Sequence, residues 1–411
     1  MKILFLAHRI PYPPNKGEKI RAFQELKFLG GRHTVDLFCF ADSDEEADHR
    51  EALKSFCRHI YVETRSTARI GVGAARCFLR GEPLSCGFFF SSKFRAKIQH
   101  ALATTTYDAV FVFCSSMAQY LPRPVPVPVV MDFVDIDSAK WAQYARRSRP
   151  PLSWLFAREA RELAWYEQEW ARASSSTVVT TRREASLLSR EGISGVEVVG
   201  NGVDIPPVKI DALPEEIRLL QPYVLFVGTM DYLPNVDAVE YFAKDILPLI
   251  RGHHPELKFV VVGRDPARRV RKLAHKPSIV VTGTVAAVEP YLVGATVVVA
   301  PFRIAQGIQN KLLEALAAGK PIVSTSGPAA AIGASHGEML LVADTSQDFA
   351  SAIVALLEDP KLYDRFTKGV DFVHRNFSWH ENLNRLEQLL LRAAGPMPSD
   401  NEVVLNRAQA S

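Results

Sequence analysis

The stretch from Val297 to Thr325 constrains the fold more than any other part of the chain. It reads VVVAPFRIAQGIQNKLLEALAAGKPIVST. Its first four residues are apolar and mostly β-branched, which is typical of a strand buried on both faces of a parallel sheet. Apolar residues then recur at helical spacing from Leu312 to Ala317, Gly319 stands where a helix-ending glycine belongs, and Pro321 follows. Strand, loop, helix and strand in this order predict an α/β domain with a parallel sheet.

The loop and the helix start in this stretch have the chemistry of a phosphate site. Gly307 lets a ligand approach the backbone closely, and the first N–H groups of the helix and its dipole favour an anion. Lys311 and Glu314 are three residues apart and therefore share a helix face. A carboxylate there can accept two hydrogen bonds from a ribose diol. The pattern alone equally fits a surface helix with an ion pair between Lys311 and Glu314.

The segment G-I-Q-N-K-L-L-E-A-L-A-A-G-K-P-I-V-S-T closely resembles the signature of family 4 retaining glycosyltransferases. These enzymes have the GT-B fold, in which two Rossmann-like α/β domains face a cleft. The resemblance implies that Glu314 holds the ribose of a sugar nucleotide, and that Gly307 and Ile308 face its pyrophosphate. The family usually has a second glutamate eight residues earlier, where this chain has Gln306. That difference bears on recognition of the sugar, and Gln306 and Lys311 are the expected catalytic residues of this domain.

Composition places the chain among soluble globular proteins. Its 411 residues predict two or three domains, and 47% hydrophobic and 23% charged residues are ordinary values. A net charge of +4 is too small to indicate nucleic acid, and it is compatible with an anionic substrate or membrane surface. The five cysteines form no C-x-x-C pair, which argues against a disulfide framework or a zinc site. We expect a cytoplasmic protein, with peripheral contact to the inner face of the plasma membrane left open.

The first predicted strand, Ile3–Ala7, leads into the loop HRIPYPPNKGEK and a helix. Ligands of open α/β sheets bind beyond the carboxyl ends of the strands. The candidate cleft residues in this loop and helix are His8, Arg9, Gly17 and Arg21. A proline-rich surface loop with a capping glycine explains the same residues. The family carries a glycine-containing loop followed by an arginine here, so the resemblance implies donor-phosphate contacts for Gly17 and Arg21.

The segment Asp132-Phe-Val-Asp135-Ile-Asp137 ends another predicted strand at the same edge. Asp135 is the candidate base that activates an acceptor hydroxyl. Asp135-Ile-Asp137 also matches the D-x-D of metal-dependent glycosyltransferases of the other major fold. Because D-x-D is a weak signal and the remaining chain does not resemble that fold, we predict no metal site. Asp137 or Ser138 alternatively caps the helix that starts near Ala139.

Two first-domain segments combine basic and aromatic residues. Between Arg65 and Lys97, seven basic residues are opposed only by Glu82, and five phenylalanines are interleaved with them. This mixture suits an anionic bilayer surface or a lipid-phosphate acceptor, and it equally suits buried phenylalanines on helices whose arginines face water. The predicted helix Leu152–Ala173 carries tryptophans among arginines, which favours either an interface or packing inside the domain.

The second predicted domain again alternates β-strands with α-helices. Its first strand, Tyr223–Gly228, is followed by a loop that lacks the Arg and Lys with which many family members bind the pyrophosphate. It resembles instead a subgroup with Pro-Asn at the helix start, so helix N–H groups and Lys311 are expected to carry more of that charge. By the same resemblance Arg264 flanks the nucleotide, and backbone atoms of Gly283, Thr284 and Val285 contact the base.

The family motif N-G-V-D, here Asn201 to Asp204, marks the domain boundary. We predict an acceptor-binding domain at residues 1–204, a linker at 205–222, a nucleotide-sugar domain at 223–376, a helix crossing back to the first domain at 377–394, and a disordered tail at 395–411. Ile10-Pro-Tyr-Pro-Pro and Asp132-Phe-Val-Asp-Ile-Asp-Ser further resemble sugar transferases encoded with exosortase (PEP-CTERM) exopolysaccharide systems.

These resemblances imply a metal-independent, retaining hexosyltransferase without a cofactor. It would transfer a sugar from a UDP- or GDP-sugar to a lipid-linked or glycan acceptor in exopolysaccharide biosynthesis, with no nucleic acid partner. Two alternatives remain: a catalytically silent GT-B-fold binding or scaffold protein of a polysaccharide assembly complex, and a sugar-nucleotide 2-epimerase. The sequence argues against a dehydrogenase, because Arg76 stands where the fingerprint begun by Gly71-Val-Gly73 needs a small residue.

Overall fold

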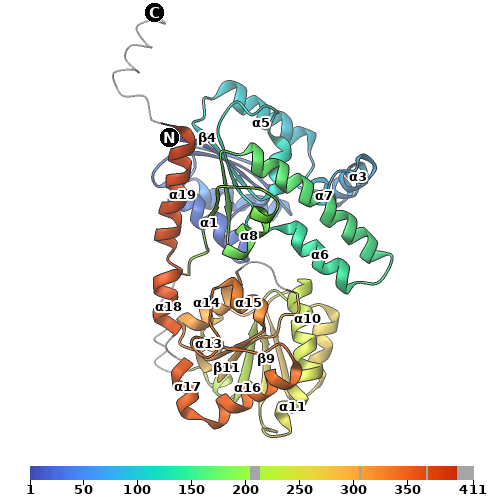
Figure 1. Ribbon diagram of the computed structural model, residues 1–411, viewed down its shortest axis with the longest axis vertical. Helices are drawn as coiled ribbons and strands as arrows, with labels where there is room; N and C mark the ends of the chain where they lie inside the picture. Colours follow the sequence, from blue (N-terminus) through green and yellow to red (C-terminus); the bar gives the residue numbers. More distant parts are fainter. Residues whose placement is uncertain (204–212, 305–307, 367–368, 396–411) are drawn as a thin grey trace, which may run out of the picture.

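The computed structural model describes residues 1–203, 213–304, 308–366 and 369–395. In these residues the chain forms two parallel β-sheets, each covered by helices, and the two domains lie one above the other (Figure 1). The described strands number seven in the first sheet, in the order β3-β2-β1-β4-β5-β6-β7, and six in the second, in the order β10-β9-β8-β11-β12-β13. Both sheets contain the 3-2-1-4-5-6 order of a doubly wound nucleotide-binding fold, which confirms the predicted pair of Rossmann-like domains.

All strand pairs in both sheets are parallel, so the carboxyl ends of the strands share one edge. The strands of the first sheet are β1 (Lys2–Ala7), β2 (Thr34–Ala41), β3 (His59–Thr64), β4 (Ala109–Phe113), β5 (Val129–Asp132), β6 (Ser176–Val179) and β7 (Val196–Val198). Those of the second sheet are β8 (Tyr223–Val227), β9 (Lys258–Val262), β10 (Ile279–Gly283), β11 (Val297–Ala300), β12 (Ile322–Ser324) and β13 (Leu341–Val342).

Helices connect the strands in both domains. The first domain contains α1 (Gly17–Gly30), α2 (Asp44–Ala47), η1 (Asp48–Leu53), α3 (Thr67–Arg80), α4 (Leu84–Phe88), α5 (Ser92–Thr104), η2 (Ser115–Tyr120), α6 (Asp137–Arg147), α7 (Leu152–Ala173) and α8 (Arg182–Arg190). The remaining helices are α9 (Glu215–Arg218), α10 (Leu233–Tyr241), η3 (Phe242–Ile246), α11 (Leu247–Arg251), α12 (Arg268–Arg271), η4 (Lys272–His275), α13 (Glu289–Gly294), α14 (Asn310–Ala317), α15 (Ser326–Ala331), α16 (Ser346–Glu358), α17 (Pro360–Phe366), α18 (Gly369–Asn376) and α19 (Trp379–Ala394).

Strand β1 shows why the central strands read as unbroken apolar runs. Its side chains alternate between the two faces of the sheet, and both faces are covered. Ile3 and Phe5 belong to the core on the side of α1 and α19, whereas Leu4 and Leu6 belong to the core on the side of α5 and α7. All four side chains are fully buried.

Helix α19 follows the second domain in sequence but packs on the first. Leu383, Leu386, Leu389 and Leu390 recur at helical spacing and lie in the same core as Ile3 and Phe5 of β1. In Figure 1 the helix runs alongside the first domain from the level of α18 to the N-terminus. This confirms the predicted crossover helix.

A proline interrupts one helical stretch of the second domain, and the predicted linker contains a helix. The helical stretch that begins at Leu233 passes through the π-helical turn η3 before α11. Pro248 lacks the N–H that would bond to the carbonyl of Lys244, so the regular helix is interrupted there. The predicted linker contains α9, and Ile217 of that helix lies in the second-domain core.

Two stretches of the chain form successive short helices in place of one long helix. The acidic stretch after β2 is the short helix α2 followed by the 3-10 helix η1. The stretch after α16 is the pair α17 and α18. Residues 367–368 between them, most of the linker (204–212) and the tail from residue 396 lie outside the described residues.

Candidate functional site

Three glycines form a floor of backbone at the carboxyl edge of the second sheet. Gly228 follows β8, Gly263 follows β9 and Gly283 ends β10. The Gly228 N–H donates to the carbonyl of Val262 at 3.0 Å, and the Gly263 N–H donates to the carbonyl of Gly283 at 3.3 Å. A Cβ on Gly263 would lie 1.6 Å from the Gly228 carbonyl oxygen, so only glycine fits there. The loops after β8 and β9 therefore pack backbone against backbone at this edge.

Helix α14 is firmly seated beside this floor. Leu312, Leu313 and Leu316 are fully buried against the second sheet. The helix ends in a Schellman motif: Gly319 has a φ of +63° and donates to the carbonyl of Leu316 at 3.0 Å, while Lys320 donates to that of Ala315 at 2.9 Å. The predicted helix-ending glycine is confirmed, and the position of the helix start is fixed by its packed body.

The Lys311 side chain extends from α14 to the start of α10. Its Nζ donates to Asn235 Oδ1 at 2.8 Å and lies 4.6 Å and 4.8 Å from the ring centroids of Phe226 and Phe302. Burial lowers the Lys311 pKa to about 7, and the negative charge of Glu314 offsets this only in part. No carboxylate of the described residues forms an ion pair with Lys311, so the alternative of a surface Lys311–Glu314 pair is not what the structure contains.

Glu314 is half-buried and lies on the same face of α14 as Lys311. Burial raises its pKa, the charge of Lys311 lowers it, and Glu289 at the start of α13 raises it further. The side chain is thus neither packed in the interior nor remote from the lysine. A carboxylate in this position is open to hydrogen-bond donors of a ligand, as the ribose prediction requires.

Helices α10 and α14 both begin without a side-chain cap, as does α1 of the first domain. The contact between Asn235 and Lys311 joins the first turns of α10 and α14. With the Asn15 amide oriented so that its oxygen faces Arg264, that oxygen accepts from Nη1 at 3.2 Å, which brings the start of α1 close to the second domain. The uncapped N–H groups and the dipoles of α1, α10 and α14 therefore lie near one another at the boundary between the domains. Helix starts of this kind favour an anion.

Arg264 offers further unsatisfied donors at this point. Its Nε and Nη2 are buried and have no hydrogen-bond partner among the residues that the structure describes, although Asp265 Oδ2 lies 3.8 Å from Nε. The Arg264 carbonyl accepts from the Met230 N–H at 2.9 Å, which holds the loop after β9 against the loop after β8. Buried donors without partners are costly and rare, and these two are free to donate to an anion.

The remaining second-domain predictions have different outcomes. Gly283 adopts a left-handed φ of +71°, Thr284 after it is exposed, and Val285 packs against the second-domain core. Their contact with a base stays a prediction. Gln306 and Gly307 lie outside the described residues. Ile308 is half-buried, and its Cδ1 is 3.8 Å from the place a Cβ on Gly200 of the first domain would occupy.

Arg21 lies inside the first domain, in contrast to its expected contact with the donor phosphate. It is 1% exposed, and its Nε and Nη2 donate to Asp132 Oδ2 at 2.9 Å and 2.6 Å. Its Nη1 donates to Asn201 Oδ1 at 3.0 Å, and Nε lies 3.1 Å from Glu25. The guanidinium is therefore committed to buried carboxylates. Gly17, at the exposed start of α1, remains at the surface.

Asn201 of the N-G-V-D motif makes contacts between the two domains. Besides accepting from Arg21, its side-chain amide donates to Asn310 Oδ1 at 3.0 Å. Its carbonyl accepts from the Asn382 amide of α19 at 3.3 Å. The sequence marked the motif as a boundary but gave no signal that Asn201 connects three elements.

Asp135 sits on a strained turn after β5. Val134 has a φ of +65°, rare for a β-branched residue, and its N–H donates to Asp132 Oδ1 at 2.7 Å. Burial raises the Asp135 pKa to about 6, while Lys140 lowers it and Asp137 raises it. A half-buried carboxyl that titrates close to neutral pH has the properties of a general base.

The helix cap predicted at Asp137 or Ser138 is wrong. Helix α6 begins at Asp137, and Ile136 before it provides no side-chain cap. Asp137 pairs with Lys140, and Ser138 donates its hydroxyl to the buried Glu167. Both side chains have these tertiary partners, which local spacing does not reveal.

A contact beside Asp135 was missed by the sequence reasoning. Tyr232, in the second-domain loop before α10, lies beside Tyr144 of α6, and the positive charge of Lys140 acts on both tyrosines. Helix α6 thus meets the second domain next to the candidate base. No sequence motif marks any of these three residues.

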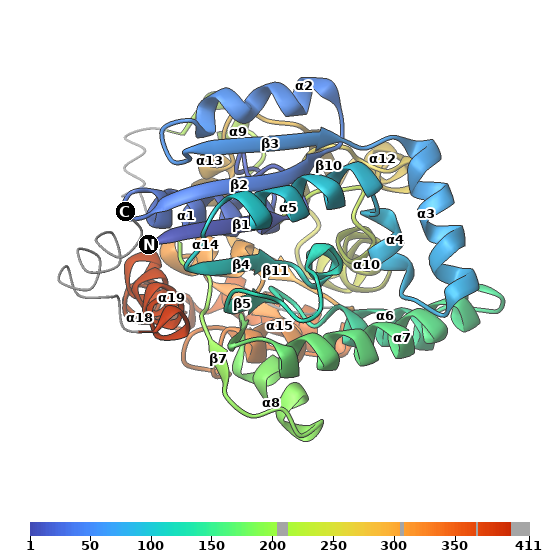
Figure 2. The same cartoon turned by 90° about the horizontal axis from the view of Figure 1, so that it is seen from above.

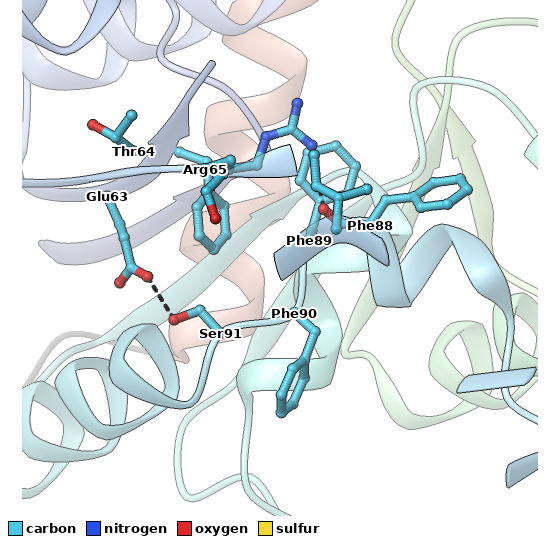
Figure 3. Close-up of a pocket in the computed structure, with 10 residues that line it drawn as sticks. Glu63, Thr64, Arg65, Phe88, Phe89, Phe90 and Ser91 are labelled. Carbon is cyan, nitrogen blue, oxygen red and sulfur yellow. Dashed lines mark hydrogen bonds between the residues drawn. The ribbon is translucent and has the colours of Figure 1, made fainter. Parts of the chain in front are cut away.

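Figure 3 shows a small pocket at the carboxyl end of β3, within the basic and aromatic segment. Arg65 stacks on the Phe89 ring at 4.5 Å, and Ser91 donates to the buried Glu63 at 2.6 Å. The pocket holds about 10 Å³, enough for one water molecule. Phe94 is fully buried whereas Phe78 is 52% exposed, so this segment contains both packed and exposed phenylalanines.

The two facing Rossmann-like domains and the crossing α19 define the GT-B architecture. Residues 221–359 match the family model described as glycosyl transferases group 1. A protein of Klebsiella pneumoniae described as an uncharacterized 44.6 kDa protein in the cps region is 20% identical over 368 residues, or 86% of this chain and 90% of that protein.

Solved structures share the fold over nearly the whole chain. The crystal structure of Anabaena HepE in complex with UDP is 18% identical, with a TM-score of 0.65 over 95% of this chain and 99% of HepE. Sucrose-phosphate synthase from Thermosynechococcus elongatus is 17% identical, with a TM-score of 0.71 over 95% of this chain and 98% of the synthase. The GT-B fold class expected from the sequence is confirmed.

Proposed function

We propose that this protein is a glycosyltransferase that takes a sugar from a nucleotide-sugar donor to a lipid-linked or glycan acceptor, with retention of configuration and without a metal. One observation carries the proposal: the Lys311 ammonium, without a carboxylate partner among the described residues, meets Asn235 where the uncapped starts of α10 and α14 adjoin the glycine floor. Positive charge and N–H dipoles fixed at this point stabilise the charge that develops on a departing diphosphate.

The donor is placed along the edge of the second sheet. Glu314 accepts from the ribose hydroxyls, and the unsatisfied donors of Arg264 reach the diphosphate or the nucleoside. Backbone atoms from Gly283 to Val285 contact the base. Gln306 and Gly307 complete the sugar and pyrophosphate contacts by resemblance alone.

The acceptor is placed against the first domain. Asp135, with a pKa of about 6, takes the proton of the acceptor hydroxyl, and the neighbouring Lys140 holds the carboxyl partly ionised at neutral pH. The strained turn at Val134 precedes this carboxyl, whose negative charge raises the pKa of Tyr232 in the second domain. The base and the diphosphate site thus lie on opposite sides of the domain boundary.

The choice of donor base and of biosynthetic pathway is argued from similar proteins. The HepE structure contains UDP, which favours a UDP-sugar over a GDP-sugar. The cps-region relative and the resemblance to exosortase-associated transferases both favour a step in polysaccharide biosynthesis. No helix of the described residues is long and apolar enough to cross a bilayer.

Calorimetry with UDP, GDP and ADP tests the donor site. We expect one diphosphate to bind and K311M to lose most of the affinity, and failure of all three nucleotides to bind would overturn the proposal. Product analysis with the matching nucleotide sugars then tests the reaction. Sugar transfer or slow donor hydrolysis supports a transferase, binding without turnover identifies the silent scaffold, and a C2 epimer formed without acceptor identifies the epimerase.

A further inference from the structure

Helix α7 presents a stripe of large exposed side chains. Trp154 and Trp165 are each 71% exposed, and Arg161 between them is 68% exposed. Spacings of seven and four residues place all three on one helix face. By contrast Trp170, one turn further, is buried in the first-domain core. Packing within the domain therefore does not explain the two exposed tryptophans.

Helix α3 exposes apolar side chains in the same way. Val72 is 72% exposed and Leu79, two turns later, is 85% exposed, with Phe78 beside it at 52%. The opposite face is fixed against α4, because a Cβ on Gly73 would lie 2.2 Å from the Gly87 carbonyl oxygen. The backbones of α3 and α4 are thus in contact, and a rotation that hid Val72 and Leu79 would break this contact.

Arg158 joins the two helices into one surface. Its guanidinium lies 4.8 Å from the centre of the Phe78 ring, and its Nη2 donates to the carbonyls of Phe78 at 3.2 Å and Glu82 at 3.3 Å. Figure 2 shows α3 and α7 on the side of the molecule away from α19. We call this surface the α3–α7 face; its exposed apolar residues are Val72, Phe78, Leu79, Trp154, Leu155 and Trp165.

The charge around this face is positive. Its exposed basic side chains are Arg80, Arg146, Arg147, Arg149 and Arg161. The nearby acids are few: Glu82 lies 3.9 Å from Arg80, and Glu162 pairs with Arg161 at 2.7 Å. Exposed tryptophans among arginines suit the headgroup region of an anionic bilayer, where indole rings reside and basic side chains meet lipid phosphates. A second copy of the chain would set arginines against arginines, because a two-fold interface pairs a patch with itself.

We propose that the α3–α7 face docks the protein on a bilayer that contains anionic phospholipid, with Trp154 and Trp165 at the level of the headgroups. This contact is independent of the proposed sugar transfer, because it needs neither donor nor acceptor. It also fixes the orientation of the first domain, so that the edge carrying Asp135 has a set direction relative to the membrane.

Flotation of the full chain with phosphatidylcholine vesicles, with and without phosphatidylglycerol, tests the docking. We expect flotation only with the anionic vesicles. R146Q/R147Q/R149Q/R161Q removes four charges from the face and should weaken partitioning about 1,000-fold. The matched control R268Q/R271Q/K272Q/K276Q removes four charges from exposed positions of the second domain and should stay within about twofold of the wild type.

The tryptophans provide a second readout. Tryptophan emission should shift to the blue on addition of anionic vesicles, and the shift should disappear in W154F/W165F while the melting temperature is unchanged.

Absence of wild-type flotation with anionic vesicles, or equal loss in both four-charge variants, would overturn the proposal. So would a dimer in sedimentation velocity that W154S/W165S converts to a monomer without loss of vesicle binding. Vesicle binding without nucleotide binding would leave the docking intact and reject only the transferase.

Discussion

Asn201 donates its side-chain amide to Asn310 Oδ1 across 3.0 Å, and this contact joins the two domains at the start of α14. The same asparagine accepts from the buried Arg21 and therefore connects the first-domain ion pair to the helix that carries Lys311 and Glu314. The N-terminal end of α14 thus depends on contacts from both domains.

Replacement of Asn310 by alanine should weaken nucleotide binding more than it weakens the fold. The variant loses one hydrogen bond, worth about 1 kcal/mol, so we expect about a fivefold higher Kd for UDP by calorimetry. The control N376A removes an exposed amide that bonds only to the backbone of its own helix turn, and should bind UDP as the wild type does. Equal affinity of N310A and N376A for UDP would show that the contact between Asn201 and Asn310 does not affect nucleotide binding.

Glu314 can be tested with the ligand as well as with the protein. If its carboxylate holds the ribose diol, E314A should raise the Kd for UDP at least about tenfold, because hydrogen bonds to charged groups are strong. The wild type should also bind 2′-deoxy-UDP more weakly than UDP, whereas E314A should not distinguish the two. Full discrimination retained in E314A would place the diol elsewhere.

The pKa of Lys311 predicts a specific dependence of stability on pH. In the folded protein Lys311 loses its proton near pH 7, whereas an unfolded lysine keeps it to about pH 10. Between these values the unfolded chain binds more protons, so the contribution of Lys311 to the free energy of unfolding rises with pH. Below pH 7 both states are protonated and that gain is absent. Urea denaturation at several pH values should show this rise in the wild type but not in K311M.

Binding of a diphosphate should reverse the lowered pKa, because a neighbouring anion favours the charged ammonium. At about pH 8.5, between the folded and unfolded values, UDP binding should therefore take up close to one proton. Calorimetry in buffers of different ionisation enthalpy measures this uptake. K311M should show almost none, and K311R, which stays charged, should also show none. Proton uptake that persists in K311M would assign the titration to another group.

The buried pair of Arg21 and Asp132 predicts a large effect on stability. Arg21→Ala leaves Asp132 and Glu25 buried without their cation, so we expect a loss of about 3–5 kcal/mol in the free energy of unfolding by urea denaturation. The control R32A alters an arginine that is 41% exposed and 3.9 Å from Glu387, and should lose about 1 kcal/mol or less. A small effect of R21A would mean that Glu25 and Asp132 are readily protonated or hydrated.

Gly202 provides a test of the crossover. A Cβ there would lie 2.3 Å from Trp379 Cγ, so Gly202→Ala should displace the start of α19 and lower the melting temperature by several degrees, by analogy with other overpacked sites. Gly71→Ala in α3 adds a methyl group where no atom lies within 4 Å and should leave the melting temperature equal or higher. Identical behaviour of the two variants would show that Trp379 yields without strain.

The sequence was sufficient for features determined by neighbouring residues. Buried strands such as β1, the glycine-ended helix α14 and the apolar stripe of α19 each follow from local periodicity and end signals. The sequence was insufficient where segments distant along the chain determine the position of a side chain. Arg21 could be assigned to the interior only once Asp132 and Asn201 were placed around it, and Tyr232 could not be linked to Lys140 by any spacing. The exposure of Trp154 and Trp165 likewise depends on which helices cover α7.

The position of α19 has a consequence for how the protein is made. Leu383, Leu386, Leu389 and Leu390 complete a core that begins with Ile3, yet all of the second domain separates them along the chain. On a translating ribosome the first sheet must therefore wait, with one apolar face covered only in part by α1, until the second domain has emerged. Nascent chains halted within the second domain should consequently be held by chaperones that recognise this unfinished face.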